Sequence, residues 1–357
     1  MLRVLVVDDS ATARELLTQV LESDPAIAVV ATATSGKQAL RLTQELRPDV
    51  ITMDIYMPDL DGFQATKEIM IAAPTPTVIV SASNQLHAVE TGMQALWAGA
   101  LALLLKPPAP GSPGFERAAR ELIETVKTMA EVKVVRHFRR QPAAAPLPPD
   151  RERCGAPRFR AIAIAASTGG PPALCRLFGG LPESFPAPLL VVQHMAHGFV
   201  EGFAKWLDAT VPVRVKMAED GETLLPGVVY VAPEQRHLGV RPRGCAALSG
   251  GPPIGGFRPA ATHLFQSAAE SFGKQVVALI LTGMGRDGVD GLRHVRDAGG
   301  VTVAQDEASS VVFGMPGAAI AEDLADAVLP IDRMAGYLAA LVTGGGWMSE
   351  RLDVKQT

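Results

Sequence analysis

The chain has 357 residues, of which 48% are hydrophobic, 5% aromatic and 20% charged, enough apolar material for about two packed domains and too much for a disordered chain. Its formal net charge of −4 at pH 7 argues against a nucleic-acid partner, and its three scattered cysteines argue against a disulfide framework. Since the longest apolar run, Ala95–Leu105, is shorter than the ~20 residues that a membrane span requires, we expect a cytoplasmic protein with no direct membrane insertion.

Short apolar runs alternate with amphipathic helical patterns along the first third of the chain. The runs that predict buried strands are Leu2–Val7, Ala28–Ala33, Val50–Met53, Thr77–Val80 and Ala102–Leu105. Between and after them, apolar residues recur at every third or fourth position, which predicts helices. These helices are expected near Ala11–Glu22, Lys37–Leu46, Phe63–Ala72, Ala88–Ala98 and Phe115–Val135. Five successive βα units predict a doubly wound parallel sheet.

The composition changes after this first domain. Arg136–Pro157 is rich in proline and arginine and lacks aliphatic periodicity, so we interpret it as a solvated linker. A second α/β pattern comes next, with a helix expected to begin at Pro171. Its strands are expected at Ala161–Ala165, Pro188–Val192, Gly227–Ala232, Val276–Leu281, Val301–Ala304 and Ala327–Leu329. Ser249–Gly256 is so rich in glycine and proline that it predicts an irregular loop.

The predicted fold class is therefore α/β, with two doubly wound parallel-sheet domains joined by a linker. The domains are expected at residues 1–130 and 158–345, with the linker at 131–157 and a loose C-terminal tail at 346–357.

Polar side chains follow four strands of the first predicted sheet: Asp8 and Asp9, Asp54, Ser81 and Lys106. Because the carboxyl ends of parallel strands meet at one edge of a sheet, we expect these side chains to converge. Clustered carboxylates repel one another unless a cation lies between them, and oxygen ligands suit Mg²⁺. An aspartate beside a divalent cation and a lysine can accept a phosphoryl group. A single acid here could instead cap the next helix, as Asp9 or Ser10 could before Ala11.

Four segments resemble response-regulator receiver domains, over about residues 1–130. They are Val6–Arg14 (VVDDSATAR), Met53–Gly62 (MDIYMPDLDG), Ser81–Ser83 (SAS) and Lys106–Pro108 (KPP). The resemblance implies that Asp54 is the phosphoacceptor. It also implies that Asp8, Asp9 and Asp54 bind Mg²⁺ together with the backbone carbonyl of Tyr56.

The same resemblance assigns a switch to the phosphoryl-binding residues Ser81 and Lys106. One departure concerns Leu103, which stands three residues before the lysine, where many receivers place an aromatic residue. We therefore do not expect an aromatic flip to transmit the signal. The phosphodonor implied by the resemblance is a CheA-type histidine kinase.

A hydroxyl, an imidazole and a carboxylate follow strands of the second predicted sheet: Ser167, His194 and Asp287. On one edge of a parallel sheet they form the set that activates a serine nucleophile, with the imidazole as base and the carboxylate as its orienting partner. Glycines nearby would let backbone N–H groups approach an oxyanion. They are Gly169, Gly170, Gly283 and Gly285.

Each of these residues also has an ordinary structural interpretation. The segment Ser167–Gly170 could cap the following helix or bind phosphate, and it reads A-x-S-x-G rather than the G-x-S-x-G of a nucleophile elbow. His197 competes with His194, and Asp287 could be a turn residue beside Gly288. The combination of the three residue types, rather than any one of them, favours a nucleophilic site.

Five segments resemble the catalytic domain of the CheB family of chemotaxis protein-glutamate methylesterases, from about Phe159 to Leu341. They are Ala165–Leu174 (AASTGGPPAL), Val191–Phe199 (VVQHMAHGF), Asp220–Pro233 (DGETLLPGVVYVAP), Leu281–Gly288 (LTGMGRDG) and Ser309–Pro316 (SSVVFGMP). The resemblance implies a triad of Ser167, His194 and Asp287, with the Met284 backbone as an oxyanion donor. It implies hydrolysis of glutamyl γ-methyl esters on chemoreceptor signalling helices, often with deamidation of glutamines, and no cofactor for the esterase chemistry. It further implies that the unphosphorylated receiver covers the active site until Asp54 is phosphorylated.

The chain departs from the family pattern at three places in this domain. Ala165 replaces a usual glycine, Ala196-His197 stands where prolines commonly occur, and Ala260–His263 stands where the family usually has a Ser-Val-Asp stretch. These departures keep open a second domain that only binds a partner, or a paralogue serving a non-motility chemosensory pathway. A DNA-binding regulator is disfavoured because no helix-turn-helix pattern is present, and a dinucleotide site because G-x-G-x-x-G is missing.

Overall fold

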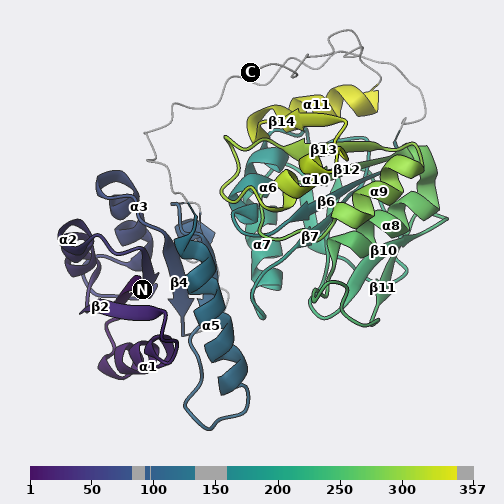
Figure 1. Cartoon of the computed structure of the whole chain (residues 1–357). Coiled ribbons are helices and arrows are strands. Elements are labelled where there is room, and N and C mark those ends of the chain that lie inside the picture. Colours follow the sequence, from purple (N-terminus) through teal and green to yellow (C-terminus); the bar gives the residue numbers. More distant parts are fainter. Residues whose placement is uncertain (83–92, 97, 133–158, 344–357) are drawn as a thin grey trace. The chain divides into compact units, whose positions relative to one another are not determined.

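The computed structural model describes residues 1–82, 93–96, 98–132 and 159–343. Most of the predicted linker, the predicted tail and most of the predicted helix at Ala88–Ala98 lie outside these residues; within the last, residues 93–96 are helical. The described residues form two parallel sheets, each with its own flanking helices (Figure 1), and one two-stranded antiparallel sheet. The predicted class of two parallel-sheet α/β domains is confirmed. None of the described helices combines the length and apolar character that crossing a membrane requires.

The first sheet has five parallel strands in the order β2-β1-β3-β4-β5. The strands are β1 (Leu2–Val7), β2 (Ile27–Ala33), β3 (Val50–Met53), β4 (Thr77–Ser81) and β5 (Ala102–Leu105). The described helices are α1 (Ala11–Glu22), α2 (Gly36–Leu46), α3 (Gly62–Ala72) and α5 (Phe115–Ala130). The strand order reverses between β1 and β3, so this is the switch point at which ligands bind in such sheets.

The second sheet has seven parallel strands in the order β14-β13-β12-β6-β7-β9-β8. The strands are β6 (Ala161–Ala166), β7 (Leu189–Gln193), β8 (Arg214–Met217), β9 (Val228–Val231), β12 (Val276–Ile280), β13 (Val301–Gln305) and β14 (Ala327–Leu329). The helices are α6 (Gly170–Gly179), α7 (Val200–Thr210), α8 (Ala261–Phe272), α9 (Val289–Asp297), α10 (Met315–Ala321) and α11 (Ile331–Thr343). Here the order reverses at β6, whose neighbours are β7 and β12.

Three strands of the structure, β8, β10 (His237–Arg241) and β11 (Cys245–Ser249), were not predicted from the sequence. β8 is short and carries two basic residues, so its sequence lacks an apolar run. An antiparallel hairpin joins β10 to β11. Its strands mix polar and small residues, which weakens the alternation by which a strand is recognised.

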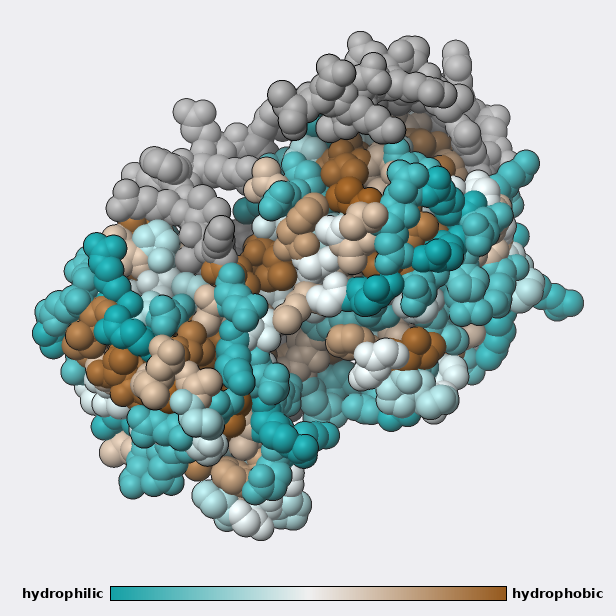
Figure 2. All heavy atoms as spheres, viewed as in Figure 1, coloured by the Kyte–Doolittle hydropathy of each residue, from teal (hydrophilic) through white to brown (hydrophobic). Residues whose placement is uncertain are grey.

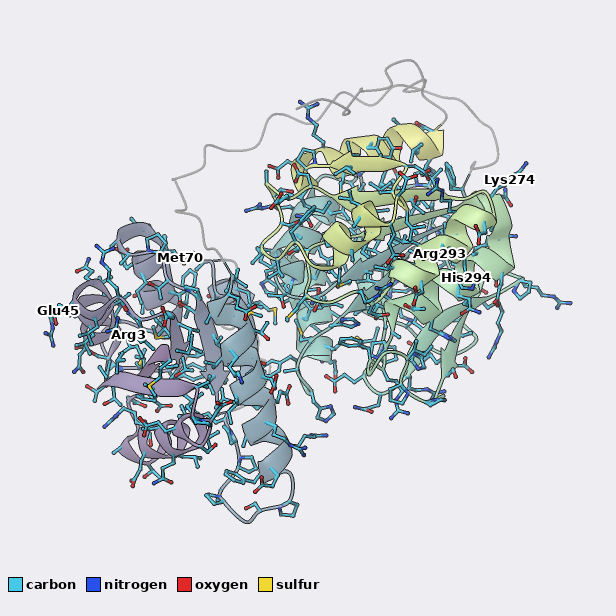
Figure 3. All side chains as sticks on the ribbon, viewed as in Figure 1. Arg3, Glu45, Met70, Lys274, Arg293 and His294 are labelled. Carbon is cyan, nitrogen blue, oxygen red and sulfur yellow. The ribbon has the colours of Figure 1, made fainter. Side chains whose placement is uncertain are left out.

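Buried aliphatic side chains fill the space between helices and sheets. All six residues of β6 (AIAIAA) are buried. Helix α8 packs against β6, β10 and α9. On the outer side, Arg293 of α9 (Figure 3) forms an ion pair with Glu322 at 2.6 Å. The face drawn in Figure 2 is largely hydrophilic, with hydrophobic residues in separate patches. The packing of α8 bears most directly on function, because its first residue lies at the carboxyl edge of the sheet.

Candidate functional sites on the two sheet edges

The edge of the first sheet brings three predicted acids together. Ligand oxygens of Asp8, Asp9 and Asp54 lie within 4.8 Å of one another, with Asp8 and Asp54 buried and Asp9 exposed. Lys106 Nζ lies 2.6 Å from Asp8 Oδ2 and 3.1 Å from Asp54 Oδ1. One ammonium therefore pairs with two of the three carboxylates. The donor set is made of oxygens and retains excess negative charge, which fits a hard divalent cation such as Mg²⁺.

The electrostatics of this edge agree with that excess charge. Burial raises the pKa of Asp54 to about 6, and the charge of Asp8 adds to the rise although Lys106 opposes it. Burial alone would lower the pKa of Lys106, but its hydrogen bond to Asp8 and the charge of Asp54 raise it instead. Lys106 is therefore cationic at neutral pH, and its charge only partly offsets the effects of burial and of Asp8 on the pKa of Asp54.

None of Asp8, Asp9 and Asp54 is the N-cap residue of the helix that follows it. Ser10, rather than Asp9, caps α1, and its side chain accepts a hydrogen bond from the Ala13 N–H at 3.4 Å. Gly62 begins α3 directly against the Asp54 carbonyl, where a Cβ would collide with that oxygen. The alternative that Asp9 serves only as a helix cap is therefore not supported.

The remaining predicted residues of this edge are also placed. Ser81 is fully buried at the end of β4, and its carbonyl accepts the Lys106 N–H at 2.7 Å. Tyr56 lies in the loop after β3 with its side chain 46% exposed. Leu103 is buried within β5, beside Ile79 of β4, so an aliphatic side chain fills the position where many receivers have an aromatic one.

The edge of the second sheet brings Ser167, His194 and Asp287 to the ends of three adjacent strands, β6, β7 and β12. The Ser167 N–H donates to the Thr282 carbonyl at 3.0 Å, and the His194 N–H donates to the Ala166 carbonyl at 2.9 Å. These bonds continue the parallel pairing just past the strand ends. The three residue types therefore share one edge, at the switch point of the sheet.

The imidazole and the carboxylate are in direct contact. His194 Nε2 lies 2.9 Å from Asp287 Oδ2, and both side chains are almost completely buried. His194 Nδ1 has no hydrogen-bond partner within the described residues, which leaves this nitrogen available as a base. Phe257 stacks on the imidazole with ring centroids 4.1 Å apart and planes inclined by 6°. His194 and not His197 is thus the histidine that pairs with Asp287.

The Asp287 carboxylate is fully hydrogen-bonded. Oδ2 accepts the Ala261 N–H at 2.7 Å, and Oδ1 accepts the Thr262 N–H at 3.0 Å and the Thr262 hydroxyl at 2.8 Å. Burial alone would raise the pKa of Asp287, but the hydrogen bond and charge of His194 and the N–H groups of Ala261 and Thr262 outweigh it and lower the pKa. Asp287 is therefore ionised at neutral pH.

The backbone around Ser167 fits an oxyanion site rather than a helix cap. The N-cap of α6 is Gly169, with no side-chain capping bond, so Ser167 does not cap this helix. A Cβ on Gly283 would lie 2.7 Å from the Ser167 Cβ, so only glycine lets this segment approach. Within the described residues the N–H groups of Thr168 and Met284 donate to no acceptor. They are therefore available to a substrate oxygen.

Three residues that contact this edge were not identified from the sequence. Gln193 Nε2 donates to the carbonyls of both Ser167, at 2.9 Å, and His194, at 2.7 Å. Its amide group also fills the space where a Cβ on Gly170 would lie. The other two are Phe257, on the imidazole, and Thr262, on the carboxylate. The only signal for Gln193 in the sequence is its place directly before the predicted histidine. Thr262 lies in the segment Ala260–His263, which departs from the family pattern, and Phe257 follows the predicted loop Ser249–Gly256.

Comparisons with known proteins follow the same division. A family model for the CheB methylesterase matches residues 162–338, and one for the response regulator receiver domain matches residues 4–112. These matches lie inside the two predicted domains, whose boundaries stay predictions.

Full-length relatives cover nearly the whole chain. A Myxococcus xanthus protein named protein-glutamate methylesterase/protein-glutamine glutaminase 4 is 51% identical over 97% of this chain and 98% of its own length. An Anaeromyxobacter dehalogenans protein of the same name, numbered 3, is 54% identical over 95% of this chain and 98% of its own. The crystal structure of the Thermotoga maritima CheB methylesterase catalytic domain covers 52% of this chain and 99% of that domain, with 42% identity and a TM-score of 0.51.

Proposed function

The chain belongs to the CheB family of protein-glutamate methylesterase/protein-glutamine glutaminases, and on this basis we propose that it hydrolyses glutamyl γ-methyl esters on chemoreceptors. The observation that carries the assignment of residues is the 2.9 Å contact between His194 and Asp287, on the same sheet edge as Ser167. A base oriented by a carboxylate next to a serine is the arrangement that activates a hydroxyl nucleophile.

In the proposed first step, Ser167 Oγ attacks the γ-carbonyl carbon of the ester while His194 takes the hydroxyl proton. No hydrogen bond joins Ser167 to the imidazole in the described structure, as in many ligand-free enzymes, where this contact tightens when substrate binds. The intermediate places negative charge on the former carbonyl oxygen, which the N–H groups of Met284 and Thr168 would bind. Its collapse breaks the bond to the methoxy oxygen, which takes the proton from His194 and leaves as methanol.

The second step releases the enzyme. Water attacks the γ-glutamyl ester of Ser167, His194 takes a proton from this water, and the same proton returns to Ser167 Oγ as glutamate leaves. An amide substrate would follow the same path with ammonia as the first leaving group. The glutaminase activity in the names of the relatives therefore needs no additional residue.

We propose that the receiver domain controls this reaction through phosphorylation of Asp54 by a CheA-type histidine kinase. Asp8, Asp9, Asp54 and the Tyr56 carbonyl would hold Mg²⁺, which supplies positive charge against the phosphoryl oxygens when it is bound. Lys106 already lies 3.1 Å from Asp54 and would pair with the phosphoryl group, as would the Ser81 hydroxyl. The excess negative charge of the cluster supports this assignment.

The test is methanol release from methylated receptor fragments, measured with and without Mg²⁺ and a small phosphodonor. We expect release in the basal state and a higher rate with the phosphodonor. Asp54→Ala should keep the basal rate and lose the increase, because only the acceptor is missing. Absence of methanol release under both conditions would contradict the proposed substrate, whereas a phosphodonor response that persists in Asp54→Ala would contradict the proposed acceptor.

A further inference from the structure

The first turn of α8 holds the Asp287 carboxylate. The N-cap residue of α8, Ala260, has no polar side chain, so it cannot accept from the free N–H groups that begin every helix. Asp287 accepts two of these N–H groups, from Ala261 and Thr262. A residue distant in the sequence therefore caps this helix and gains the favourable helix-terminus field for its negative charge.

The Thr262 hydroxyl connects this cap to the rest of the site. It donates to Asp287 Oδ1 at 2.8 Å and accepts the Gly288 N–H at 2.9 Å. Both of its hydrogen-bonding functions are thus used, and both partners belong to the segment that carries the carboxylate. Oδ1 is held entirely by Thr262, which leaves Oδ2 to face His194 Nε2.

We propose that Thr262 is a positioning residue, whose hydroxyl fixes the Asp287 carboxylate in the orientation that directs Oδ2 at His194. This inference rests on the proposed function, in which that contact selects the imidazole tautomer. A partial rotation of the carboxylate about its Cβ–Cγ bond would turn Oδ2 away from His194 and lengthen the contact. The Thr262 hydroxyl donates to Oδ1 in addition to the Thr262 N–H, so two donors of one residue hold this oxygen.

The chemistry of a hydroxyl suits this position. A threonine donates a hydrogen bond at any pH, whereas a carboxylic acid at residue 262 could donate to Asp287 only while protonated. Thr262 therefore places a neutral donor next to the ionised carboxylate. A hydrogen bond to a charged group is among the stronger ones in proteins.

The experiment compares Thr262→Val, which removes the hydroxyl at nearly constant shape, with Thr262→Ser, which keeps it, in the full-length chain. With methanol release as the assay, we expect Thr262→Val to lower kcat by about 10- to 100-fold with KM unchanged, as for the loss of one hydrogen bond to a charged group. Thr262→Ser should stay close to the wild-type kcat. Equal kcat values in the valine variant and the wild type, or equal losses in the valine and serine variants, would overturn the proposal.

Two further measurements separate this proposal from the proposed function. If Thr262 acts through Asp287, adding Thr262→Val to Asp287→Asn should produce no further loss of kcat; an additive loss would overturn the positioning role. The second is the NMR signal of the His194 Nε2–H proton, identified by its disappearance or shift in Asp287→Asn. We expect Thr262→Val to shift this signal and Thr262→Ser to preserve it. This result does not depend on the substrate, so an unchanged signal contradicts the inference even if the esterase proposal fails, and inactive wild-type protein contradicts only the proposed function.

Discussion

Asp54 and Asp287 occupy similar places in the two sheets, but their pKa values are shifted in opposite directions. Each is a buried carboxylate that follows a strand at the carboxyl edge of a parallel sheet. Burial acts in the same direction on both, yet the pKa of Asp54 is raised to about 6 and that of Asp287 is lowered. The fold provides the position, and the neighbouring groups decide how the carboxylate behaves.

The difference lies in the charges and donors around each acid. Asp54 shares its edge with two other carboxylates and one ammonium, so it is poised to take up a cation and a charged group. Asp287 faces one imidazole and three donors from the start of α8, so its charge is already satisfied. The first site requires a bound cation to balance its charge, whereas the groups of the second site already balance the charge of Asp287. Four experiments test this contrast.

Removal of the nucleophile should have the largest effect. Ser167→Ala should lower methanol release by ~10⁴-fold or more, since the hydroxyl forms the covalent bond. Phosphorylation of Asp54, measured with a radiolabelled small phosphodonor, should remain at the wild-type level. Methanol release that persists in Ser167→Ala would remove the serine from the mechanism, and a loss of phosphorylation would indicate damage beyond the second sheet.

Asp287→Asn should test whether this carboxylate supports the fold as well as the reaction. We expect kcat to fall by about 10³- to 10⁴-fold, because the imidazole loses its orienting anion. Since folding lowers the pKa of Asp287, its ionised form stabilises the protein above the unfolded pKa near 4, and this contribution disappears as the pH falls through the folded pKa.

Urea unfolding at two pH values measures that contribution. At pH 7 we expect Asp287→Asn to lower the free energy of unfolding by about 1–3 kcal/mol, the range for hydrogen bonds to a charged group. Near pH 3 the difference from the wild type should shrink. A difference that is equally large at both pH values would mean that charge plays no part in the cap of α8.

Gln193→Leu should show how far the positions of Ser167 and His194 depend on the hydrogen bonds of the Gln193 amide. The substitution keeps the approximate volume but removes the donor to the Ser167 and His194 carbonyls. The Ser167 carbonyl keeps the Gly170 N–H, whereas the His194 carbonyl loses its hydrogen bond among the described residues. We expect kcat to fall by about 10-fold or more, with a smaller change in KM. Gln193→Glu offers a matched control, because it presents a carboxylate to the same two carbonyls and should be more damaging than leucine.

Mg²⁺ should have the smallest effect of the four, and only on the first site. At a Mg²⁺ concentration ten times the dissociation constant, binding to the folded state alone adds about 1.4 kcal/mol of stability. Calorimetric unfolding of the full chain should show this as a rise in the melting temperature of one transition, reversed by EDTA. Asp54→Ala should reduce the rise and Ser167→Ala should leave it intact; a rise in Asp54→Ala as large as in the wild type would place the cation elsewhere.

The sequence predicted those parts of the molecule that depend on local pattern. Apolar runs identified the strands around both edges, and the residues just after them, such as Asp54 and Ser167, were found because parallel strands end on a common edge. The resemblance to the receiver and CheB families then supplied roles. In the structure, two of the residues found in this way, His194 and Asp287, lie 2.9 Å apart.

The contacts that escaped prediction join segments far apart in the chain. Thr262 and Phe257 come after a glycine- and proline-rich loop, and nothing in their spacing indicates that this loop returns to Asp287 and His194. Gln193 directly follows the predicted strand Pro188–Val192, and its side-chain bonds to two carbonyls exist only once β6 and β7 are paired. Side-chain bonds to backbone groups leave no periodic signal in the sequence.

The packing of the Gln193 amide against Gly170 also constrains which residues evolution can place at these two positions. No side chain can be added at residue 170 while the glutamine keeps its place, because a Cβ there would overlap the amide. Nor can the glutamine shorten without releasing the carbonyls that it joins. We therefore expect the two positions to co-vary in aligned relatives: a larger residue at position 170 should appear only beside a smaller one at position 193.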